Sequence, residues 1–170
     1  MAELPNDAGT LRLRVELVDR EAPVRGPEPV VTEDGRAPSG RLLGAAGVEY
    51  YDPRDGEWWP VVRLPALYLA AESFASLDGQ FRDLLAGAIP GFAWQSGEDG
   101  ALGLQLGPAE PPGGGLVVEV GIDLAAFLAE VGQVPARPGA ELALFRFATT
   151  RPAAVAFADA LRREGGRLLG

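Results

Sequence analysis

The chain has 170 residues, 47% of them hydrophobic, and a formal net charge of −9. This length predicts one domain with one sizeable core, and the negative charge disfavours nucleic acid and anionic membranes as partners. All 15 basic residues are arginine, so lysine is absent, and histidine and cysteine are absent too. These absences exclude Ser-His-Asp triads, histidine or thiolate metal sites and lysine Schiff bases.

The missing side chains leave few kinds of enzyme open. Paired carboxylates remain available as acid and base, or as oxygen ligands of magnesium or calcium. The 23 glycines and 15 prolines also indicate high-GC coding, which explains missing lysine better than missing histidine or cysteine. We find neither a signal-peptide pattern nor an apolar run long enough to span a membrane, so we expect a cytoplasmic protein.

The first 40 residues contain one clear element. We expect a disordered N-terminus over residues 1–9 and a half-buried strand over 11–18, where apolar and polar residues alternate. Residues 19–40 form a proline-rich, mobile loop in this interpretation, with a short edge strand at 30–32 as its only element.

Residues 48–62 predict a hairpin, because Pro53, Asp55 and Gly56 supply turn chemistry between two aromatic segments. The segment after Pro65 fits either a third strand or the beginning of a helix. From there the spacing predicts a helix that begins at Ser73 as its N-cap and stops at Gly87. Its buried face comprises Phe74, Leu77, Phe81, Leu84 and Leu85.

The second half of the chain alternates strands and helices. We predict a hairpin over 91–106, a central strand over 116–122, a short helix from Asp123 to Val131 and a strand over 141–147. A last helix begins at 151–153 and stops at Gly165 and Gly166, and its inward residues are Val155, Ala158, Leu161 and Phe157. We detect no internal sequence repeat. These elements predict an α+β domain, with a mainly antiparallel or mixed sheet and about three helices packed on it.

The hairpin is also the candidate functional site. Tyrosine and tryptophan are typical anchors of protein interfaces, and this segment combines them with carboxylates. The alternative is a structural hairpin whose alternate aromatic residues pack on the core while the turn carboxylates stay in water. The candidate partner-binding residues are Tyr50, Tyr51, Asp52, Asp55, Glu57, Trp58 and Trp59.

Other motifs do not favour a ligand. Asp52 and Asp55 flank Pro53 and Arg54, a spacing that does not match an EF-hand loop, so we expect no metal. The glycines at 113–115 precede a strand, whereas a phosphate-binding loop follows one, so they indicate a flexible connection. We therefore expect no cofactor and assign no catalytic residue.

The hairpin sequence supports a resemblance to one family. Residues 55–59, Asp-Gly-Glu-Trp-Trp, are followed by Val61 and Val62, and this segment resembles the Asp-x-x-Trp-Leu strand of the bacterial WapI-type immunity proteins. The order of predicted elements over residues 48–163 is similar as well. This resemblance implies a small protein that neutralises a secreted toxin by binding it.

Three functions remain open from the sequence. We expect a non-enzymatic, acidic bacterial protein that binds another protein, which is basic if charge governs the encounter, and which the resemblance suggests is a toxin. The first alternative is a hydrolase that uses carboxylates alone or with a metal ion. The second is a structural or assembly subunit. The sequence does not define an oligomeric state.

Overall fold

The structure is a computed structural model that describes residues 1–21, 40–96, 100–109, 115–124 and 142–169. Its described elements form two four-stranded antiparallel sheets and two helices. The predicted α+β class is confirmed, whereas about three helices were expected. The predicted helix from Asp123 to Val131 falls largely outside the described residues, and Asp123 itself ends a strand.

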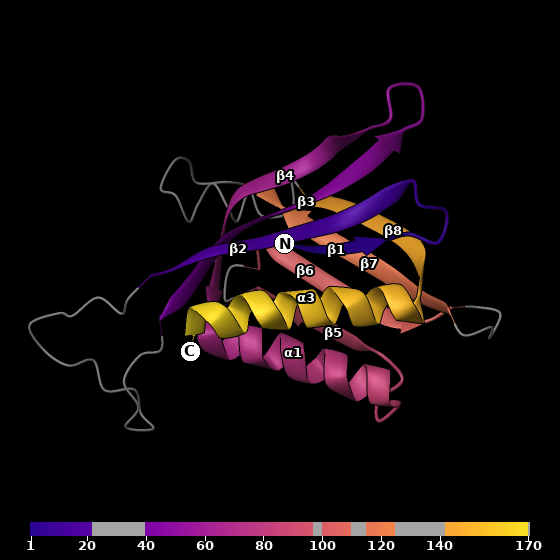
Figure 1. Ribbon diagram of the computed structural model, residues 1–170. Coiled ribbons are helices and arrows are strands. Elements are labelled where there is room, and N and C mark those ends of the chain that lie inside the picture. The colour runs from indigo at the N-terminus through magenta and orange to yellow at the C-terminus, as the bar shows by residue number, and fades with distance from the viewer. Residues whose placement is uncertain (22–39, 97–99, 110–114, 125–141, 170) are drawn as a thin grey trace, which may run out of the picture.

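Sheet A has the order β1-β2-β3-β4 (Figure 1). Its strands are β1 (Ala2–Pro5), β2 (Leu11–Glu21), β3 (Arg41–Asp52) and β4 (Glu57–Ala70). The expectation of a disordered N-terminus is wrong, because Ala2 and Leu4 are fully buried and pair with β2. These two alternating apolar side chains give β1 a buried face of its own. The predicted loop over 22–39, with its edge strand, lies outside the described residues.

Strand β4 forms an outer edge of sheet A and pairs with β3 among the described strands. It contains Pro60 and Pro65, which have no N–H to donate and are therefore tolerated at a sheet edge. The register with β3 shifts next to both prolines. Prolines and bulges are common protections of an edge strand against pairing with another chain.

Sheet B has the order β5-β6-β7-β8. Its strands are β5 (Phe92–Gln95), β6 (Leu102–Pro108), β7 (Gly115–Asp123) and β8 (Leu142–Thr150). Strand β7 lies centrally, as its apolar sequence predicted, and its alternate residues from Leu116 to Ile122 are buried. The predicted hairpin is confirmed as the β5–β6 pair, whose turn residues 97–99 are not described.

Helix α1 (Ala71–Ala86) begins earlier than expected. Strand β4 continues to Ala70, which precedes the helix without a side-chain cap. The prediction of Ser73 as the N-cap is therefore wrong, and its hydroxyl instead donates to the carbonyl oxygen of Gln95 at 3.2 Å. Gly87 ends the helix as predicted, with a left-handed φ of 77°.

Helix α3 (Arg151–Leu169) continues past the predicted stop at Gly165. Gly165 is buried against the ring of Phe74, where a Cβ would overlap that ring. The glycine therefore permits close approach of the two helices. Ala158 and Leu161 are buried as expected, but the inward prediction for Val155 is wrong, because this residue is 40% exposed. The buried face passes through Ala154 instead.

The described elements repeat one order, four strands followed by a helix. The helices lie side by side (Figure 1), and α3, which follows sheet B, packs against β1 and β2 of sheet A. Phe81 of α1 contacts Phe92 of β5 and Phe157 of α3. Both sheets and the two described helices thus contribute to one hydrophobic core. Neither described helix has the length and apolar character needed to span a membrane.

Candidate functional site

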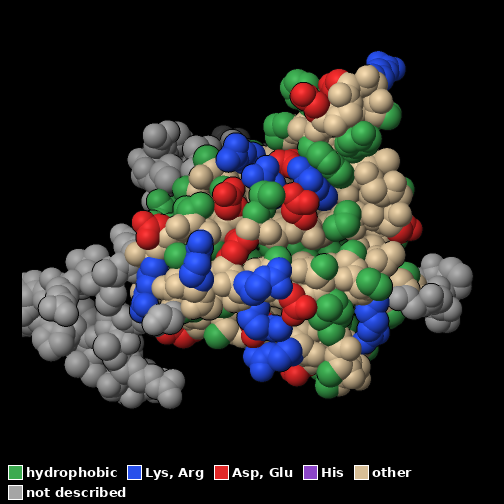
Figure 2. All heavy atoms as spheres, viewed as in Figure 1, with side chains coloured by type: hydrophobic (Ala, Val, Ile, Leu, Met, Phe, Trp, Pro, Cys, Tyr) green, Lys and Arg blue, Asp and Glu red, His purple; other side chains and the backbone are tan. Residues whose placement is uncertain are grey.

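The β3–β4 hairpin projects beyond the rest of sheet A (Figure 1). Strand β2 supports it as far as Leu11, which lies opposite Tyr50, and the Tyr51 N–H donates to the carbonyl oxygen of Thr10 at 2.9 Å. Hydrophobic and acidic side chains gather on this projection (Figure 2). The candidate residues from the sequence are therefore brought together on one protruding element.

Local hydrogen bonds order the turn of the hairpin. The N–H of Gly56 donates to the Asp52 carbonyl at 2.9 Å, and Gly56 has a φ of +74°, a conformation that favours glycine. The Asp52 carboxylate accepts from the N–H of Arg54, and the Asp55 carboxylate accepts from the N–H of Glu57, each at 2.9 Å. Such side-chain contacts to nearby backbone are why aspartate favours turns.

One face of the hairpin carries a packed aromatic pair. Tyr51 and Trp58 lie opposite each other on β3 and β4, with ring centroids 5.4 Å apart. The guanidinium carbon of Arg12, on β2, lies 4.0 Å from the centroid of the Trp58 ring. This distance is typical of a cation–π interaction. Arg12 therefore joins the hairpin to the body of sheet A.

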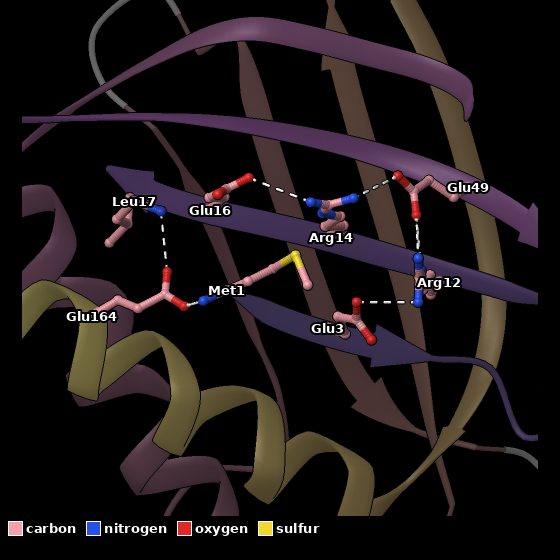
Figure 3. A network of polar contacts seen from close by, with 8 residues as sticks. All are labelled: Met1, Glu3, Arg12, Arg14, Glu16, Leu17, Glu49 and Glu164. Carbon is pink, nitrogen blue, oxygen red and sulfur yellow. Dashed lines mark hydrogen bonds and ion pairs between the residues drawn. The ribbon is translucent and has the colours of Figure 1, made fainter. Parts of the chain in front are cut away.

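Arg12 is held in place by carboxylates (Figure 3). Its Nε donates to the Glu49 carboxylate at 2.8 Å, and its Nη2 lies 2.7 Å from the same carboxylate. Its Nη1 lies 3.1 Å from the Glu3 carboxylate. Glu49 further contacts Arg14 at 3.4 Å. The Arg12 and Glu49 side chains are only 14% and 15% exposed, so this pair is shielded from solvent.

The opposite face of the hairpin is open. Tyr50 and Trp59 lie opposite each other and are 41% and 46% exposed, and Val61, at the adjacent bulge, is 50% exposed. Asp52 and Glu57 form the next pair toward the turn, and strand alternation places them on this same face. The Trp59 Nε1–H donates to the Asp55 carboxylate at 3.0 Å, which fixes one orientation of the indole.

The sequence prediction located the hairpin but did not separate its two faces. The alternative, in which alternate aromatic residues pack on the core, is not what the structure shows, because none of the four aromatic side chains belongs to the hydrophobic core. Arg12 was missed as a neighbour of the site. Its alternation with apolar residues placed it on the polar face of its strand, but the contact with Trp58 depends on strand register.

A second surface feature lies on sheet B. A groove of about 550 Å³ is lined by Gln95, Glu119, Leu144 and, opposite each other on β6 and β7, Gly103 and Gly121. It contains no candidate from the sequence. Within the described part of the chain, no group of three or more aspartate and glutamate residues is arranged to hold a metal ion.

Comparison with known proteins gives no family for the chain. No family model matches it, and searches of curated proteins and of solved structures also find no match. The resemblance to WapI-type immunity proteins stays a prediction.

Proposed function

We propose that this protein binds another protein through its β3–β4 hairpin. The observation that carries the proposal is the position of four aromatic side chains on a projecting element, outside the hydrophobic core. Exposed tryptophan and tyrosine are enriched among residues that dominate binding energy at interfaces. Tyr50 and Trp59 form the contact surface, and Tyr51 and Trp58 support it from behind.

The partner contacts side chains of the hairpin rather than adding a strand beside β4, the outer strand of sheet A among the described strands. Addition of a strand needs a regular series of free N–H and C=O groups. The edge of β4 that pairs with no described strand is interrupted by Pro60 and Pro65 and by the bulges beside them. Recognition through the aromatic face is the mode that remains compatible with this edge.

The charge of the protein favours a basic partner. The net charge is −9, and the turn region carries Asp52, Asp55 and Glu57 against the single cation Arg54. Opposite charges accelerate encounter and align two surfaces before they dock. A basic toxin neutralised in a bacterial cytoplasm, as the WapI-type resemblance suggests, is the partner class that we propose.

Partner capture tests this function. Tagged protein is incubated with lysate of the source organism and with its secreted proteins, and bound proteins are identified by mass spectrometry. We expect the double substitution Tyr50→Ser and Trp59→Ser to abolish capture of a specific basic protein, because it removes both exposed aromatic anchors. Urea unfolding of the variant verifies that it folds.

The matched control is Val18→Ser. Val18 is 58% exposed and lies toward the other end of β2 from Leu11, the residue that pairs with Tyr50. This variant should retain capture. Equal capture by wild type and by the double variant would refute the hairpin as the binding site.

A further inference from the structure

The packed face of the hairpin already binds an arginine of the chain itself. Arg12 stacks on Trp58, whose ring also contacts Tyr51, and its nitrogens are held by carboxylates. An aromatic cross-strand pair with carboxylates at its border therefore forms a guanidinium site on this hairpin. The planar guanidinium suits such a site, because it stacks on aromatic rings and donates to two carboxylate oxygens at once.

The open face of the hairpin has the same combination of side chains. Tyr50 and Trp59 form its aromatic cross-strand pair, and Asp52 and Glu57 form the adjacent pair. Asp55 contacts the edge of the Trp59 ring. Among the described residues, no arginine forms an ion pair with any of these three carboxylates. The open face thus resembles the Arg12 site without its arginine.

We propose that Tyr50, Trp59 and Glu57 bind an arginine side chain of the partner. The guanidinium stacks on Trp59, and the carboxylate of Glu57 accepts its hydrogen bonds. This inference rests on the proposed function and specifies which residue type of the partner is recognised. Lysine fits less well, since its ammonium is compact and strongly hydrated and lacks the planar geometry.

Two peptides of equal charge test the choice of arginine. Gly-Arg-Gly-Arg-Gly-Arg and Gly-Lys-Gly-Lys-Gly-Lys are titrated into ¹⁵N-labelled protein, and the three indole Nε1–H signals are followed by NMR. Trp59 reports on the open face, and Trp58 reports on the Arg12 face. Trp94 is the internal reference, because it is 6% exposed and its Nε1–H donates to the Ser73 carbonyl at 2.9 Å.

We expect the arginine peptide to shift the Trp59 signal and to bind about two- to fivefold more tightly than the lysine peptide, as the strength of an exposed cation–π contact implies. The Trp94 signal should not move. Equal affinity for the two peptides would overturn the inference, because it would show attraction by net charge alone. A Trp59 signal that stays fixed during the titration would overturn it as well.

Two charge-matched variants locate the contact. Glu57→Gln should weaken the arginine peptide about twofold or more and reduce its advantage over lysine. Glu119→Gln removes the same charge from sheet B, where Glu119 forms no ion pair with a described residue, and should leave that advantage unchanged. An equal loss of the arginine peptide's advantage in both variants would contradict a defined site at Glu57.

The competing occupant of the open face is Arg54 from another copy of the chain, since Arg54 is exposed on the β3–β4 turn. A Trp59 signal that moves with protein concentration alone, and no longer does so in Arg54→Gln, would assign the site to self-association and overturn the inference. The two proposals fail separately. If partner capture depends on Tyr50 and Trp59 but arginine is not preferred, only this inference is refuted. If arginine is preferred but capture does not depend on the hairpin, the proposed function is refuted.

Discussion

Glu49 is the residue that fixes the base of the hairpin. It accepts from Arg12 and contacts Arg14 while only 15% exposed. Removal of one partner from a shielded charge pair leaves the other charge without compensation, and this loss is more costly than the loss of a surface pair. The stability of the Trp58 face therefore depends on this carboxylate.

We predict that Glu49→Gln lowers the free energy of unfolding by about 1–3 kcal/mol, since hydrogen bonds to charged groups contribute in this range. Urea unfolding measures the change. Glu16→Gln is the matched control, because Glu16 is 39% exposed and makes one 3.4 Å contact with Arg14. An exposed pair contributes about 0–1 kcal/mol. Equal losses in the two variants would contradict the shielding that we describe.

Within helix α3, the adjacent glycines Gly165 and Gly166 differ in the space beside them. Gly165 faces Phe74 at the contact between the helices, whereas a Cβ added at Gly166 would meet no described atom within 4 Å. Alanine is favoured over glycine inside a helix by about 1 kcal/mol. The sign of each glycine-to-alanine substitution should therefore depend on the space beside it.

We predict that Gly165→Ala destabilises the protein by about 1–3 kcal/mol, as inserted volume does in a packed core. Gly166→Ala should stabilise it by up to about 1 kcal/mol. Thermal unfolding of the two variants, side by side, measures both signs. Stabilisation by Gly165→Ala would show that the helices separate without cost.

The elements were predictable where local chemistry decides them. Turn residues at 53–56 located the hairpin, and Gly87 correctly ended α1. Gly165 was misread because a stop and a close contact both require glycine, and only the packing of α1 distinguishes them. Which face of the hairpin is covered depends on Arg12, which lies 37 positions before its ion-pair partner Glu49. The strand register that brings these two residues together exists only in the folded sheet.

The two sheets should unfold together at the scale of the whole molecule. Helix α3 packs on sheet A, and Thr149 of sheet B, 1% exposed, donates its hydroxyl to the Pro5 carbonyl at 2.6 Å. The order of four strands and a helix occurs twice among the described elements, but the sequence has no matching repeat. Each sheet needs only alternating apolar residues, so the two halves can share an order of elements without sharing residues.

We predict one cooperative transition, so the most protected amides of β2 and β7 should exchange with the same free energy of opening in native-state hydrogen exchange. Thr149→Val should lower that free energy by about 0.5–1.5 kcal/mol in both sheets, because the hydrogen bond from the Thr149 hydroxyl to the partly buried Pro5 carbonyl is lost. A loss confined to β7 would indicate that the sheets unfold independently.

Affinity for the captured partner tests the binding role of the hairpin most directly. Isothermal titration calorimetry compares wild-type protein, the Tyr50→Ser and Trp59→Ser double variant, and the Val18→Ser control. We predict that the double variant binds at least about 30-fold more weakly, since a dominant interface residue contributes about 2 kcal/mol or more, while the control binds as wild type does. An unchanged Kd in the double variant would contradict the role assigned to the hairpin.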